Sequence, residues 1–302
     1  MSSNIVLNRS NILNSGNNKL LYEFPGKITF EEGDQLAISH MNIYYSWYNI
    51  SSRYNNNYFQ YKWWDANGDL TSIHGITIPD GFYSANTLYE YFQKVMVQNN
   101  HYLLTDPSIG GDYVYFIEIL TNITYYSIEI RLSSLCEEYV TNNNLLYPAN
   151  AGWIAPPNTL DGNGEVVTHY ATPQIIIPSN NNFGELVGFN ANAIYQDTDV
   201  QGQYSFLNDF AANMNPSSSF IITCSLIDNT LGSPNNILYA FTIPNNVSFG
   251  DLITSNTDVI YSKIKPGSYS NLRLEIQDEQ FRPLQIIDPT MLIVLSILKN
   301  SK

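Results

Sequence analysis

Short runs of strand-forming residues recur along the whole 302-residue chain, separated by Gly, Pro, Asn or Asp. The runs are rich in Ile, Tyr, Phe and Val, and several alternate apolar and polar residues. Near the middle of the chain, Ile128, Ile130 and Leu132 share one face of such a run. Glu129 and Arg131 share the opposite face. A period of two places one face of a strand toward a core, so the pattern predicts an all-β protein.

Only one segment has the pattern of a helix. In SANTLYEYFQKVMVQNN, Ser84 is placed to cap the N-terminus, and apolar residues follow at i, i+3, i+4 and i+7: Leu88, Tyr91, Phe92 and Val95. A parallel α/β fold needs helices between its strands, which this chain lacks. We therefore predict that residues 1–302 form a single jelly-roll β-sandwich, with one short amphipathic helix lying on a sheet.

Two segments depart from the strand pattern. Residues 1–18 are polar and rich in Asn and Ser, which predicts a flexible N-terminal arm that orders on contact with neighbouring proteins. Residues 137–172 are dense in Asn, Pro and Gly and have few periodic apolar positions. They predict an insertion or long loop within the one domain.

The charge of the chain excludes some partners. The formal net charge is −14, and the 13 Lys and Arg residues are scattered. Nucleic-acid binding needs clustered basic charge, so we expect no direct DNA or RNA partner, and anionic membranes are disfavoured for the same reason. The surface is polar mainly through Asn and hydroxyl side chains, which suits contact with other proteins.

The sequence predicts a protein made in the cytosol that stays soluble. Cys136 and Cys224 are the only cysteines, which fits a reducing compartment, and Cys224 within FIITCSL has the setting of a small core residue. The N-terminus lacks the pattern of a signal peptide. The longest apolar run, MLIVLSIL, is far shorter than the roughly 20 residues of a membrane span.

No motif for catalysis or cofactor binding is present. The four histidines are far apart and lack the spacing of metal ligands. The segments at 65–69 and 161–165 resemble calcium loops but lack Gly at the sixth position and Glu at the twelfth, so they are better interpreted as Asn-Gly turns. We expect no enzyme activity, no metal and no cofactor.

Five motifs in a fixed order resemble a known family. They are the aromatic Ser-Trp-Tyr-Asn-Ile at 46–50, the helix-opening IPDGFYSANTLYEYF, the Gly-Phe pair in FGELVGFN, the segment from SFIITCSLIDN to IYSKIKPGS, and the final hairpin LEIQDEQFRPLQIIDPTMLIVLSIL. Together these motifs resemble the penton (minor capsid) proteins of virophages and of Polinton/Maverick-type elements, with mavirus-like virophages the most similar. One departure is visible: the hairpin turn often carries Gly before its Pro, where this chain has Phe281-Arg282-Pro283.

The resemblance implies a structural role. It implies a single jelly roll, five copies of which form a capsomer at each five-fold vertex of an icosahedral capsid. The expected location is the virion, after assembly in the host cytoplasm, and the expected partners are other copies of the chain and the major capsid protein. It implies no catalysis and no cofactor.

The last strand is apolar on both faces. Met291, Ile293, Leu295 and Ile297 form one face of MLIVLSIL, and the other face consists of Leu292, Val294, Ser296 and Leu298. Burying such a side chain contributes roughly 1.5–3 kcal/mol, so both faces should be covered. Either the helix around 88–95 or the segment 137–172 lies over the outer face, or another subunit does. The outer face is thus one candidate subunit interface, through Leu292, Val294 and Leu298.

The aromatic cluster SWYNISSRYNNNYFQYKWW is the second candidate interface, because Trp, Tyr and Arg are enriched where protein surfaces meet. We expect contact roles for Trp47, Tyr48, Asn49 and Arg53, and a core position for Trp63. The alternative is a core strand followed by an Asn-rich loop.

Two other functions fit the composition. Exposed Trp and Tyr beside Asn and Asp would suit a soluble carbohydrate-binding or host-attachment module, whose partner would be a host surface glycan. A hydrolase on the same scaffold would require two carboxylates or a histidine cluster converging in a cleft, and the spacing shows neither.

Overall fold

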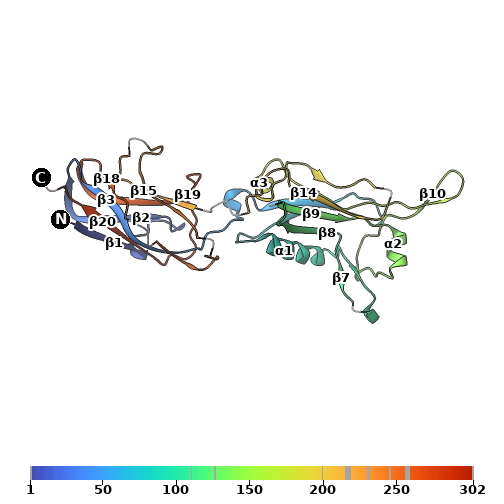
Figure 1. Ribbon diagram of the computed structural model, residues 1–302. Coiled ribbons are helices and arrows are strands. Elements are labelled where there is room, and N and C mark those ends of the chain that lie inside the picture. The colour runs from blue at the N-terminus through green and yellow to red at the C-terminus, as the bar shows by residue number, and fades with distance from the viewer. Residues whose placement is uncertain are drawn as a thin grey trace. The chain divides into compact units, whose positions relative to one another are not determined.

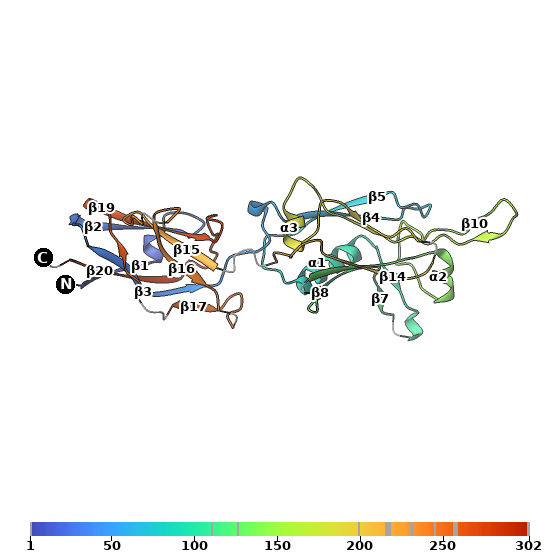
Figure 2. The same ribbon diagram turned by 45° about the horizontal axis from the view of Figure 1, so that its top comes forward.

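The structure is a computed structural model that describes residues 2–109, 111–125, 127–198, 200–214, 219–229, 232–244, 246–255 and 259–300. Contacts divide the chain into two compact units, which Figures 1 and 2 show as ribbons. The first unit consists of Met1–Tyr48 and Ser217–Lys302, and the second unit of Asn49–Pro216. The second unit is therefore an insertion in the sequence of the first.

The first unit contains two antiparallel sheets. One has the order β1 (Ser2–Asn8), β20 (Met291–Leu298), β3 (Gln35–Tyr44) and β17 (Leu252–Ser255), with β18 (Ser262–Lys263) also paired to β3. The other has the order β16 (Ile237–Thr242), β15 (Ser219–Cys224), β19 (Gly267–Asp278) and β2 (Lys19–Phe30). A short 3-10 turn, η1 (Arg9–Asn11), follows β1.

This strand order is that of a jelly roll. Without β18 the two sheets contain eight strands, which can be numbered 1 to 8 in chain order. In this numbering one sheet has the order 1-8-3-6, and the other has the order 5-4-7-2. Apart from the consecutive pair β15 and β16, neighbours within a sheet thus come from distant parts of the chain, as the Greek-key connections of a jelly roll require. The prediction of an all-β jelly roll is confirmed, and the first unit alone supplies it.

The core of the first unit lies between the inward faces of its sheets. Trp47, just after β3, contacts Phe220 of β15 edge-to-face, with ring centroids 5.8 Å apart. Cys224 is buried there as predicted, and burial raises the pKa of its thiol to about 12. Other buried side chains come from both sheets: Leu7, Leu36, Ile38, Met41, Ile43, Ile293, Leu295, Ile297, Ile222, Leu272, Leu274 and Ile276.

The second unit is also mainly β. One sheet has the order β13 (Ala193–Ile194), β12 (Gln174–Ile176), β4 (Tyr58–Trp63) and β5 (Ser72–Thr77), and another has the order β14 (Gln203–Leu207), β9 (Ser127–Ser133) and β8 (Ile117–Asn122). Two short hairpins pair β6 (Leu103–Leu104) with β7 (Tyr113–Val114) and β10 (Thr159–Leu160) with β11 (Val166–Val167). The described helices are α1 (Ala85–Gln98), α2 (Glu137–Asn142) and α3 (Phe183–Val187), with 3-10 turns η2 (Ser52–Tyr54) and η3 (Pro107–Ile109).

Helix α1 forms where the sequence predicts it. The Ser84 hydroxyl accepts a hydrogen bond from the Thr87 amide, which caps the helix. Leu88, Phe92 and Met96 are buried in an aromatic core, and the helix packs against β8. Trp63 lies in the same core as predicted, together with Trp64 and Trp153.

The predicted domain organisation differs from the observed one. Where the sequence predicts one domain, the structure has two units, because the strands of both units carry the same period of two. The predicted flexible arm is instead a strand, since β1 pairs with β20 from Ser2 to Asn8; Met1 lies outside the described residues. Residues 137–172 are only part of the inserted segment, and they contribute Val140, Leu145 and Trp153 to the core of the second unit. None of the described helices is long and apolar enough to cross a membrane.

Candidate functional site

The outward side of the sheet β1-β20-β3-β17 carries a group of apolar side chains, which we call the apolar sheet face. It consists of Val6, Leu252, Leu292, Val294 and Leu298. Val6 of β1 lies opposite Val294 of β20 in the strand register. Val6 is 50% exposed, Leu252 44% and Leu298 39%, while Leu292 and Val294 are half-buried. The three last-strand residues predicted as interface candidates therefore lie on one surface.

The two predicted intramolecular covers, the helix around 88–95 and the segment 137–172, belong to the second unit. Helix α1 buries its apolar stripe in the core of the second unit, and residues 137–172 contribute to that same core. One local cover exists at Ser296, whose hydroxyl lies 3.2 Å from the Tyr261 hydroxyl. The outer face of the last strand thus stays partly open to solvent. Sequence reasoning missed Val6 and Leu252, because pairing between distant strands leaves no local signal.

The aromatic candidates occupy different settings. Trp47 is 1% exposed, and its ring centroid lies 4.7 Å from that of Tyr45, so it belongs to the core of the first unit. The structure therefore does not place Trp47 on a contact surface. Tyr48 is half-buried, with its ring centroid 6.3 Å from that of the exposed Phe249.

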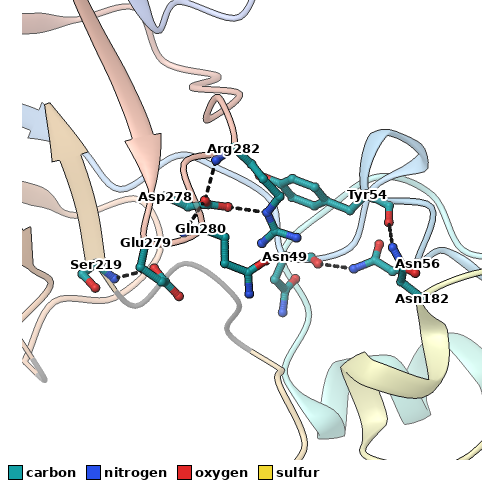
Figure 3. A network of polar contacts seen from close by, with 9 residues as sticks. All are labelled: Asn49, Tyr54, Asn56, Asn182, Ser219, Asp278, Glu279, Gln280 and Arg282. Atoms are coloured by element: carbon teal, nitrogen blue, oxygen red, sulfur yellow. Dashed lines mark hydrogen bonds and ion pairs between the residues drawn. The ribbon is translucent and has the colours of Figure 1, made fainter. Parts of the chain in front are cut away.

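Asn49 and Arg53 belong to the second unit. Asn49 is buried, accepts a hydrogen bond from the Tyr83 amide at 2.8 Å and donates to the Tyr83 carbonyl at 2.7 Å. The main-chain carbonyl of Asn49 accepts a hydrogen bond from the Asn56 side-chain amide at 2.8 Å, and Figure 3 shows this contact. Asn49 is therefore a structural anchor of the loop that follows Tyr48, whereas Arg53 in η2 is exposed.

The final hairpin turn in the first unit is held by a buried carboxylate (Figure 3). Asp278 is 0% exposed and accepts hydrogen bonds from the amides of Gln280 and Arg282 at 2.9 and 2.8 Å. The Arg282 guanidinium donates to the same carboxylate at 2.7 Å. Within this turn Phe281 has a φ of 60°, a left-handed conformation that favours Gly. The turn therefore holds this conformation at a residue other than Gly, because Asp278 fixes the residues on both sides of Phe281.

Two histidines meet inside the second unit, although they are far apart in sequence. The rings of His74 and His101 have centroids 4.5 Å apart, and His101 stacks on Trp63 at 4.9 Å. Burial and the neighbouring His74 lower the pKa of His101 to about 3, and burial also lowers the pKa of His74. Within the described ranges, no group of three or more His, Cys, Asp or Glu side chains is placed to hold a metal ion. The pair is a feature of the core.

Two solved structures are similar to this chain along nearly its whole length. No protein-family model matches the chain, and no curated protein sequence matches it. The chain is similar to the solved structure of the mavirus penton protein, with 10% identity, a TM-score of 0.43 and 99% of each chain covered. It is also similar to a chain in the structure of the Sputnik virophage, with 11% identity, a TM-score of 0.42, and 99% of this chain and 97% of that chain covered. The solved structures similar to this chain thus include virophage proteins, as the sequence motifs predict.

Proposed function

We propose that the chain is a structural protein of a virion: a penton (minor capsid) protein whose homopentamers occupy the five-fold vertices of an icosahedral capsid beside the major capsid protein. The observation that carries the proposal is the apolar sheet face. The order of the sequence motifs points in the same direction. On this proposal the protein assembles in the host cytoplasm and acts by contact with other proteins, without catalysis.

The chemistry of the apolar sheet face suits a protein contact. Along β1 and β20 the side chains that share the side of Val6 and Val294 are apolar, amide or hydroxyl groups, with no charge. Depletion of charge at the centre of a surface is typical of protein interfaces. Covering Val6, Leu252 and Leu298 would remove apolar area from water at about 25 cal/mol per Å².

A ring of copies requires two different surfaces on each subunit. In a closed ring the contacts are head-to-tail, so the apolar sheet face of one copy would meet another surface of the next copy. A stable contact of this kind buries about 800 Å² on each partner, more than the five side chains supply alone. Polar residues of β3 and β17 on the same side of the sheet, such as Asn42 and Thr254, would add to the contact area.

The experiment is the native mass of the purified chain across concentration and salt, measured by native mass spectrometry and light scattering. We expect a species of five times 34.2 kDa for the unchanged chain. The double variant Val6→Glu/Leu298→Glu places two charges on the apolar sheet face and should shift the mass to the monomer. The matched control is Ile123→Glu, because Ile123 is 88% exposed in the second unit. It should leave the mass unchanged.

Three results would contradict the proposal. An unchanged chain that stays monomeric at all concentrations would remove the pentamer, and a trimer would favour an attachment protein. A pentamer that survives the double variant, with unfolding midpoints equal to those of the control, would exclude the apolar sheet face as the seam.

A further inference from the structure

The second unit has a groove between β13 and β14, with a volume of about 650 Å³, which we call the β13–β14 groove. Its walls include Asn190, Asn192 and Tyr195 on one side and Ser205, Leu207 and Asp209 on the other. This volume lies within the roughly 300–1,000 Å³ typical of sites for small ligands. All the lining residues belong to the second unit, and none belongs to the apolar sheet face.

Strand β13 directs unpaired main-chain groups toward the groove. Within the described part of the chain it is an edge strand, whose one partner strand is β12. The Asn192 carbonyl accepts a hydrogen bond from the Ile177 amide at 2.8 Å, so the main-chain groups of Asn192 face β12. Main-chain groups alternate in direction along a strand, so those of Ala193 and Tyr195 point away from β12. The Ala193 amide bonds to the Asn192 side chain at 2.8 Å, which leaves the Tyr195 main chain facing the groove.

Strand β14 also directs main-chain groups toward the groove, from the opposite wall. Among the strands that the structure describes, it lies at the edge of its sheet and pairs with β9 alone. The Asn208 amide donates to the Ile128 carbonyl at 3.1 Å, so by the same alternation Ser205 and Leu207 direct their main-chain groups away from β9. Both Ser205 and Leu207 line the groove. Two strand edges without charge or proline, the usual protections of an edge, thus face one cavity.

The groove has an ordered polar group at the Asn190 end. The Asp209 amide donates to the Gly188 carbonyl at 2.8 Å, and the Asp209 carboxylate accepts from the Asn190 amide at 2.8 Å. Asn190 and Asp209 both line the groove, so these hydrogen bonds hold part of its wall in place.

The lining combines ring-stacking and hydrogen-bonding groups. Tyr195 is 43% exposed and Leu207 41%, so both offer apolar surface, while Phe206 is half-buried beside them. Asn190, Asn192 and Ser205 offer groups that donate and accept hydrogen bonds. The one charged side chain in this lining is Asp209, and no Lys, Arg or His occurs there among the described residues. Anionic ligands are therefore disfavoured.

We propose that the β13–β14 groove binds a neutral saccharide. A neutral hexose has an apolar C–H face that packs on an aromatic ring and hydroxyls that both donate and accept. The Tyr195 ring matches the first, and the amide side chains and free main chain of the groove match the second. The buried tryptophans do not take part: Trp47, Trp63, Trp64 and Trp153 are at most 3% exposed. The site is independent of the proposed capsid role.

The test uses the full chain on an array of neutral and sialylated glycans, followed by NMR titration with free glucose, galactose and mannose. We expect binding to neutral glycans and shifts confined to residues 189–209. Tyr195→Ala should weaken the affinity about tenfold, the scale of a lost aromatic contact. The matched control is Tyr125→Ala, because Tyr125 is a more exposed tyrosine of the same unit, at 68%, and lies outside the groove.

Several results would overturn the inference. The first two are an absence of binding to neutral glycans and binding to sialylated glycans alone. The other two are an equal loss of glycan affinity in Tyr195→Ala and Tyr125→Ala, and the selection of extended peptides that bind the groove. Since native mass is measured separately, failure of the saccharide site leaves the pentamer test unaffected, and the converse also holds.

Discussion

Acid should destabilise the second unit through His101. The His101 Nδ1 lies 2.7 Å from the Tyr61 hydroxyl, and the Asn99 side-chain amide donates to that same hydroxyl oxygen at 2.8 Å. With its pKa lowered to about 3, the His101 imidazole is neutral near pH 7, so an unprotonated Nδ1 can accept a hydrogen bond from the Tyr61 hydroxyl. Burial and the adjacent His74 hold the pKa of His101 at about 3.

The sign and size of the effect follow from proton linkage. An unfolded histidine has a pKa of about 6.5, so the folded state binds fewer protons than the unfolded state between pH 6.5 and 3. Stability is therefore full above pH 6.5 and is lost as the pH falls through this window. At pH 5, about 1.5 units below the unfolded pKa, the free energy of unfolding should drop by about 2 kcal/mol. The lowered pKa of His74 acts in the same direction.

The assay is urea unfolding at pH 7.5 and 5.0, followed by tryptophan fluorescence, since the Trp63 ring stacks on His101. His101→Gln keeps an acceptor for Tyr61 but cannot take up a proton, so it should lose most of the pH dependence. His169→Gln is the matched control, because His169 is exposed in the same unit, and it should behave like the unchanged chain. A drop of about 2 kcal/mol that persists in His101→Gln would refute the reasoning.

Two further substitutions test the local structure. Asp278→Ala should lower the free energy of unfolding by about 3 kcal/mol in urea titrations, because it removes a buried acceptor and breaks its ion pair with Arg282. If the variant were as stable as the unchanged chain, the turn would not depend on the carboxylate. Gly188→Ala should cost about 1–3 kcal/mol in thermal unfolding, because Gly188 has a φ of 82° and an added Cβ would lie 2.4 Å from the Phe210 carbonyl oxygen. Gly162→Ala, where a Cβ meets nothing within 4 Å, is the control and should be close to neutral.

Local patterns in the sequence predicted several features correctly. The period of two identified the β architecture, and the cap at Ser84 with the stripe through Leu88 and Phe92 identified α1. The core positions of Trp63 and Cys224 were also predictable from the apolar residues around them. These features depend on residues within one or two turns or strands, so the chain encodes them locally.

The tertiary structure alone decided which strands pair and what they cover. β1, near the N-terminus, pairs with β20, near the C-terminus, and Val6 lies opposite Val294 in this pairing. The sequence predicts a flexible arm for the segment that contains β1, because the segment is polar. The sequence also did not determine whether an aromatic residue lies in the core or at the surface. Trp47 is buried, while Tyr195 is exposed in a groove between two strand edges. The physical reason is that pairing and burial are set by contacts between residues hundreds of positions apart. An alternating strand has the same local pattern whichever partner it finds.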